Sequence, residues 1–160
     1  MIVMTRIDYR LLHGQVAFAW TNNLSANAIL MANDVVAKDT FRKKTFMMAK
    51  PDNAKLIFKS IEDSAAAIKS GVTDKYRVFI VVENVADAYK LTKLVPEVKL
   101  IDLGLSSKKD DSVNIAKSVY VTQSEIDQLT ELENSGVRVV VQQAPADKDV
   151  EFHNLIEKKE

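Results

Sequence analysis

The sequence predicts an α/β protein in which helices cover both faces of a mainly parallel sheet. Short apolar, β-branched runs alternate with amphipathic stretches along all 160 residues. Several runs are apolar throughout, as Val78–Val82 shows, and this composition is typical of strands that are covered on both faces. No repeat, low-complexity segment or Pro/Gly-rich linker divides the chain, so we expect one domain over residues 1–160.

Strands and helices are expected to alternate in order. The expected strands are Ile2–Asp8, Ala28–Asn33, Lys55–Lys59, Arg77–Val82, Lys99–Leu103, Ser118–Thr122 and Val137–Gln142. The expected helices are Gly14–Asn23, Ala37–Ala49, Glu62–Ser70, Val85–Val95, Ser124–Ser135 and a last one at about Asp147–Lys158.

Local signals mark several of these boundaries. Thr122 and Glu125 have the spacing of a capping box at a helix start. Gly71 and Gly136 follow two of the expected helices, and Pro51 follows another.

Composition excludes several classes of function. The chain has no cysteine, so disulfides, thiolate metal sites and cysteine nucleophiles are ruled out. Lys plus Arg equals Asp plus Glu at 22 each, which gives no reason to expect a nucleic-acid partner. No apolar run approaches the ~18–20 residues of a membrane span, and the N-terminus lacks the pattern of a secretory signal. We therefore expect a cytoplasmic protein.

Ligand chemistry in such a sheet is expected at the carboxyl ends of the strands. Asp34, Glu83, Asn84 and Asp102 stand at such ends. Polar residues at strand ends commonly cap helices or contact water, and we expect these four to do so.

The loop after the first strand is different, because it concentrates functional groups. Arg6, Asp8 and Arg10 share parity, so they point the same way if the strand stays extended. Two guanidiniums flanking a carboxylate on a central strand are costly to bury without a purpose. His13 comes three residues after Arg10, directly before the first expected helix.

The start of that helix offers an anion cradle. The N–H groups of Gly14, Gln15 and Val16 are among its unpaired donors, and Gly14 has no side chain to obstruct a ligand. An imidazole, oxyanion donors and a guanidinium are three parts of a phosphoryl-transfer site. From the residues alone, a His13 that only caps the helix is an equal alternative. His153, in the last expected helix, is expected to be a surface residue.

Three other classes of protein fit poorly. A response-regulator receiver needs paired acids at the end of the first strand, where only Asp8 stands. A dinucleotide-binding enzyme needs a Gly-rich turn, and the chain has only four glycines. A metal hydrolase needs a ligand motif that His13 and His153 do not form, so no metal or cofactor is expected. A non-catalytic α/β interaction module remains as the alternative.

One motif resembles a known family. Arg6-x-Asp8-x-Arg10-Leu11-x-His13-Gly14-Gln15-Val16, followed by Trp20, resembles the N-terminal signature of the IIB components of the mannose/fructose/sorbose family of bacterial sugar phosphotransferase systems. Similarity extends through Ala32–Ala37, Met48–Pro51, Asp102–Gly104 and Pro145. The chain departs from the family where Asp102 and Gly104-Leu105 stand in place of an asparagine followed by two glycines.

The resemblance implies a fold and an activity. The implied fold is a three-layer α/β/α domain with six parallel strands in order 3-2-4-1-5-6 and an antiparallel edge strand. The implied activity is a relay: a phosphorylated IIA protein passes its phosphoryl group to Nδ1 of His13, which passes it to a sugar carried through the membrane by the IIC and IID proteins. The domain is then cytoplasmic and associated peripherally with that permease.

Roles for the other motif residues also come from the resemblance. Arg10 steadies the phosphoryl oxygens, with Arg6 and the N–H groups of Gly14, Gln15 and Val16 as further phosphate contacts. Asp8 orients Arg10, Arg6 or the imidazole.

Overall fold

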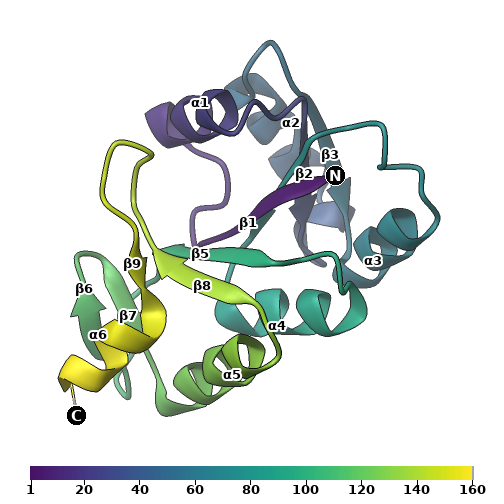
Figure 1. Cartoon of the computed structure of the whole chain (residues 1–160). Helices are drawn as coiled ribbons and strands as arrows, with labels where there is room; N and C mark the ends of the chain where they lie inside the picture. The colour runs from purple at the N-terminus through teal and green to yellow at the C-terminus, as the bar shows by residue number, and fades with distance from the viewer. Residues whose placement is uncertain (160) are drawn as a thin grey trace.

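A seven-stranded sheet forms the centre of the computed structural model, which describes residues 1–159 (Figure 1). The strand order is β3-β2-β4-β1-β5-β8-β9. Six strands run parallel, and β9 (Val150–Glu151) pairs antiparallel with β8 at the edge. The parallel strands are β1 (Ile2–Asp8), β2 (Ala28–Ala32), β3 (Lys55–Lys59), β4 (Val78–Val82), β5 (Leu100–Leu105) and β8 (Arg138–Val141). This confirms the predicted fold class and the implied order; residue 160 of the predicted domain lies outside the described residues.

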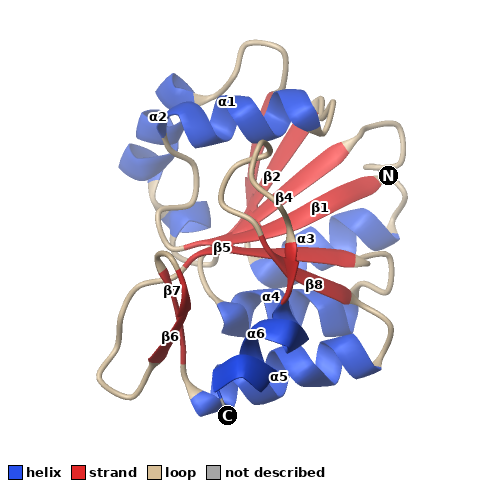
Figure 2. Ribbon diagram, turned by 60° about the vertical axis from the view of Figure 1, so that its left-hand side comes forward, coloured by secondary structure: helices blue, strands red, loops and turns tan. Residues whose placement is uncertain are grey.

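Helices cover both faces of this sheet, giving three layers (Figure 2). On one face α1 packs over a core that includes Met4, Trp20 and Phe79. On the other face α3, α4 and α5 cover a larger core that includes Ile7 and Ile80. The helices are α1 (Gly14–Asn23), α2 (Thr40–Ala49), α3 (Ile61–Lys69), α4 (Val85–Leu94), α5 (Gln123–Asn134) and α6 (Phe152–Lys159), with a 3-10 turn η1 (Val36–Lys38) before α2.

Two predicted helices begin later than expected. The helix predicted at Ala37–Ala49 is divided, because the Asp39 side chain accepts the Arg42 N–H and starts α2 after the short turn η1. The last helix was predicted from about Asp147, but α6 begins at Phe152 because Val150–Glu151 pair with β8.

The strand predicted at Ser118–Thr122 exists as β7 (Val119–Val121), outside the main sheet. It pairs antiparallel with β6 (Val113–Ala116), a strand that the sequence did not indicate because Val113 and Asn114 adjoin a polar loop. The β6–β7 ribbon stands beyond the carboxyl end of β5, where the Ser106 N–H donates to the Ser118 carbonyl oxygen.

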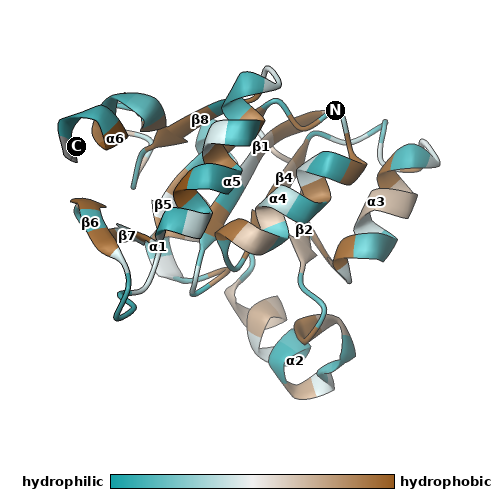
Figure 3. Cartoon of the chain, turned by 90° about the horizontal axis from the view of Figure 1, so that it is seen from below, coloured by the Kyte–Doolittle hydropathy of each residue, from teal (hydrophilic) through white to brown (hydrophobic). Residues whose placement is uncertain are grey.

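The predicted boundary signals are confirmed at α5 and α3. Thr122 and Glu125 form both hydrogen bonds of a capping box at the start of α5. Gly71 and Gly136 follow the caps of α3 and α5 with φ angles of 85° and 100°. Helix α2 lies at the periphery of the molecule (Figure 3): it has no fully buried residue, and its Phe46 is partly buried near Phe58 of β3. Within residues 1–159, no helix combines the length and the apolar character that crossing a bilayer requires.

Candidate active site at the carboxyl end of β1

The site is built on the last residues of β1. Arg6 and Asp8 share parity with Met4, so they lie on the face that α1 covers, and both are buried. The strand ends at Asp8, whose carbonyl oxygen accepts the Leu11 N–H at 2.9 Å in a tight turn. The expected common direction therefore holds for Arg6 and Asp8, whereas Arg10 lies beyond the strand and is exposed.

Asp8 holds the imidazole of His13. Its Oδ2 lies 2.9 Å from His13 Nε2, and its Oδ1 accepts the backbone N–H of Arg10 at 2.9 Å. A carboxylate next to Nε2 favours the tautomer with a proton on Nε2, which leaves the lone pair on Nδ1. Asp8 therefore orients the imidazole and the Arg10 backbone, rather than the Arg10 guanidinium.

His13 stands at the N-cap position of α1, but its side chain makes no capping hydrogen bond. The alternative in which the His13 side chain only caps the helix is therefore wrong, since the imidazole contacts Asp8 instead. The His13 side chain is 15% exposed, so its ring is reachable from solvent.

The start of α1 leaves three backbone N–H groups without a helical partner. The first N–H bonded within the helix belongs to Ala17 and donates to the His13 carbonyl oxygen at 3.3 Å. The N–H groups of Gly14, Gln15 and Val16 precede it and lie outside the helical ladder. Gly14 has a φ of 47°, a left-handed value that favours glycine.

Arg6 lies beneath this loop and is 1% exposed. Its Nη1 donates to Asp102 Oδ2 at 2.6 Å and to the Gln142 carbonyl oxygen at 3.0 Å. Its Nε lies 3.5 Å from Asp8 Oδ2, an ion-pair distance without hydrogen-bond geometry. The guanidinium carbon is 5.4 Å from the centre of the Trp20 ring on α1.

Asp102 on β5 is the second carboxylate of this buried group. Its Oδ1 accepts the Gln142 N–H at 2.9 Å. Burial raises the pKa of Asp102 to about 7, against the opposing effects of Arg6 and the Gln142 N–H. Two carboxylates, those of Asp8 and Asp102, therefore approach the one guanidinium of Arg6.

Of the other singled-out residues, Asn84 and His153 are placed as expected, whereas Glu83 pairs with a side chain instead of capping a helix. Asn84 caps α4 by accepting the Asp87 N–H at 2.8 Å. Asp34 accepts the Ile61 N–H at 2.8 Å. Glu83 accepts a hydrogen bond from the Asn33 side chain. His153 is exposed and lies 2.9 Å from Glu133, which raises its pKa.

The sequence did not indicate that Asp102 and Gln142 hold the Arg6 guanidinium. Asp102 was expected to cap a helix or contact water, and instead it is fully buried against Arg6. This contact could have been inferred from the strand order, because β1 and β5 are neighbours and Arg6 lies opposite Asp102 in their register.

No group of three metal-ligating side chains occurs within residues 1–159. The Asp8 oxygens are engaged by His13 and the Arg10 backbone, and Asp34 is engaged by α3. The site is therefore built around an imidazole, a guanidinium and backbone donors.

Fold and site together define a class: a parallel α/β protein with a carboxylate-oriented histidine at the carboxyl edge of its sheet. Residues 2–160 match the family model described as the PTS system sorbose subfamily IIB component. The chain belongs to this family and is a IIB component of a sugar phosphotransferase system.

Relatives and solved structures agree. The chain is 37% identical over 124 residues to a probable phosphotransferase enzyme IIB component of Streptococcus pyogenes serotype M6, covering 78% of this chain and 76% of the relative. It is 30% identical to the N-acetylgalactosamine-specific phosphotransferase enzyme IIB component 2 of Escherichia coli K12, covering 97% and 98%. The crystal structure of the IIB domain of the Klebsiella pneumoniae sorbose permease shares the fold, with a TM-score of 0.93 at 24% identity and coverage of 100% and 98%.

Family membership has general consequences. IIB components are phosphotransferase domains that act in sugar uptake, and membership implies IIA and membrane IIC/IID partners in general.

Proposed function

We propose that His13 is the phosphoryl carrier of this IIB component. The observation that carries the proposal is the 2.9 Å contact between Asp8 Oδ2 and His13 Nε2, which leaves the lone pair on Nδ1. In the first step Nδ1 attacks the phosphorus atom of a phosphohistidine on IIA. A new P–N bond forms as the old one breaks, and the IIA imidazole leaves with its electron pair.

Positive charge and backbone N–H donors stabilise the phosphoryl group during its transfer. Arg10 is exposed beside the loop, and its guanidinium makes no ion pair within residues 1–159. It is therefore available to hold two phosphoryl oxygens, while the N–H groups of Gly14, Gln15 and Val16 hold the remaining charge. In the second step a sugar hydroxyl bound by IIC and IID takes the phosphoryl group from His13.

The relay also gives the domain its place in the cell. IIA and the sugar must reach the same exposed loop in turn, so the domain works in the cytoplasm and associates peripherally with the membrane permease. The sugar contacts His13 only within the assembled complex.

The test is intact-mass spectrometry after incubation with phosphoenolpyruvate, Enzyme I, HPr and the matching IIA protein. We expect one acid-labile phosphate on the wild type, one on His153→Ala and none on a folded His13→Ala variant. His153 is the matched control because it is the other histidine and is exposed. A wild type that takes no phosphate would instead favour the non-catalytic interaction module, and a full adduct on His13→Ala would overturn the assignment.

A further inference from the structure

Arg6 has a different surrounding from the one expected of a phosphate ligand, because it is 1% exposed and its Nη1 is held by other groups. We propose that Arg6 is a positioning residue: held by Asp102 and seated over Gly104, its guanidinium aligns the Asp8 carboxylate that fixes the tautomer of His13. This inference rests on the proposed role of His13 as the nucleophile.

A continuous chain of contacts supports the proposal. Gln142 binds both ends of the Arg6–Asp102 pair, since its N–H donates to Asp102 and its carbonyl oxygen accepts from Arg6. Arg6 Nε then lies 3.5 Å from the same Asp8 oxygen that contacts His13 Nε2. Residues of β1 and β5, together with Gln142 directly after β8, therefore fix the oxygen atom on which the imidazole depends.

The seat of the guanidinium is shaped for it. A Cβ atom added at Gly104 would collide with the Arg6 guanidinium, so only glycine leaves the space. On the opposite side stands the Trp20 ring, whose Nε1 donates to the Gln143 carbonyl oxygen at 3.0 Å and so fixes the ring. Arg6 is confined between β5 and α1.

The chemistry of the pair explains why arginine stands here. Nε and Nη1 approach two different carboxylates, a fork that the single ammonium of lysine does not reproduce. Charge matters as well as shape, because Asp8 without Arg6 would be a buried carboxylate balanced only by His13. Arg6 thus keeps Asp8 in place while the imidazole changes charge during transfer.

The test compares the imidazole of His13 across variants by ¹⁵N-edited NMR of the unphosphorylated protein. Arg6→Met with Asp102→Asn removes both charges together, retains similar volume and leaves an acceptor for the Gln142 N–H. Gly104→Ala perturbs the same contact differently, by displacing the guanidinium. Asp149→Asn is the matched control, since Asp149 pairs with Arg138 on the surface, 2.7 Å away.

We expect a wild-type imidazole protonated mainly on Nε2, unchanged in the control, and a mixture of tautomers in both test variants. The transfer rate at saturating phospho-IIA should fall about 10- to 100-fold, as when groups that orient metal-bound histidines are removed. The phospho-IIA concentration for half-maximal rate should change little in these variants. If Arg6 contacted the phosphate directly, its loss would raise that concentration.

Failure of this inference differs from failure of the proposed function. Imidazole signals identical to wild type in the folded test variants would overturn the positioning role, even where the wild type accepts phosphate. If the double variant does not fold, Arg6→Lys provides the comparison, because it keeps the positive charge but does not reproduce the approach to two carboxylates. A wild type that takes no phosphate would refute the relay, while a changed tautomer would still support the alignment of Asp8 by Arg6.

Discussion

The chemistry at His13 depends on which ring nitrogen Asp8 holds. An imidazole has two nitrogens, and the carboxylate contact at Nε2 leaves the lone pair on Nδ1, the nucleophile of the proposed transfer. The sequence indicated the acid and the imidazole, and left Arg10, Arg6 and the imidazole open as the group that Asp8 orients. It did not indicate the partner of Asp8, because the turn after β1 that brings His13 back to Asp8 depends on Leu11, a non-glycine residue with a φ of 61°.

At the same scale, Arg10→Lys should lose more activity than its unchanged charge suggests. A planar guanidinium holds two phosphoryl oxygens at once, and an ammonium does not reproduce that geometry. We expect the single-turnover transfer rate from phospho-IIA to fall by about 10²-fold or more, as when a transition-state donor is removed. Near wild-type kinetics in Arg10→Lys would count against a bidentate role.

At the scale of elements, the six parallel strands were predictable because each is a short, largely apolar run. β2 and β4 are buried at every residue and were predicted to within one residue at each end. β7 lies within the predicted strand Ser118–Thr122, but β6 and the position of β9 were not indicated, since a strand of two to four residues has too little pattern to distinguish it from a loop. The Arg6–Asp102 contact was not predicted either, because it arises from the pairing of β1 with β5.

The burial of Asp102 on β5 predicts how the stability of the protein depends on pH. The pKa of Asp102 in the folded protein is about 7, above the ~3.9 of an unfolded aspartate. Ionisation between these values favours the unfolded state, so the stability of the wild type relative to Asp102→Asn should be highest below about pH 4 and fall as the pH rises to about 7.

Urea titrations at pH 5 and pH 8 measure this difference, with fluorescence of Trp20, the single tryptophan, as the signal. From pH 5 to pH 8 the advantage of the wild type should fall by on the order of 1–3 kcal/mol. A relative stability that is constant or rises over that range would show that Asp102 is already ionised in the folded protein at pH 5.

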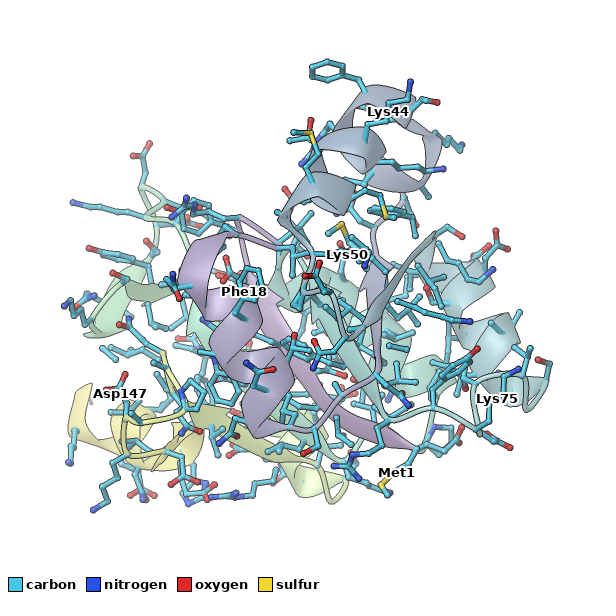
Figure 4. All side chains as sticks on the ribbon, turned by 90° about the horizontal axis from the view of Figure 1, so that it is seen from above. Met1, Phe18, Lys44, Lys50, Lys75 and Asp147 are labelled. Carbon is cyan, nitrogen blue, oxygen red and sulfur yellow. The ribbon has the colours of Figure 1, made fainter. Side chains whose placement is uncertain are left out.

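At the scale of the whole molecule, the reactive loop stands at one end of the sheet, flanked by α1. Figure 4 shows Phe18 on α1, and Lys44 on α2, which projects away from the body. The Phe18 side chain is 42% exposed, so it is not buried against a neighbouring helix and is accessible to a partner. In the proposed relay one surface serves IIA and then the permease, so we expect its contacts to be modest and to exchange readily.

Phe18→Ala should therefore weaken IIA binding while leaving the fold unchanged. We expect chemical-shift changes on titration with IIA to fall on the first loop and α1, and a several-fold weaker affinity in the variant. Val72→Ala is the matched control, as Val72 is 60% exposed and lies in the segment between α3 and the start of β4, at the opposite end of the sheet. Shift changes confined to that opposite end would rule out docking at the loop.

The central claim is that His13 accepts the phosphoryl group on Nδ1 because Asp8 holds Nε2. The direct measurement is ¹⁵N and ³¹P NMR of the protein, labelled at its histidines and phosphorylated by IIA. We expect phosphorus coupled to Nδ1 of His13, with the proton retained on Nε2, and an unmodified His153 in the same spectrum. Phosphorus on Nε2 of His13, or on His153, would contradict the account.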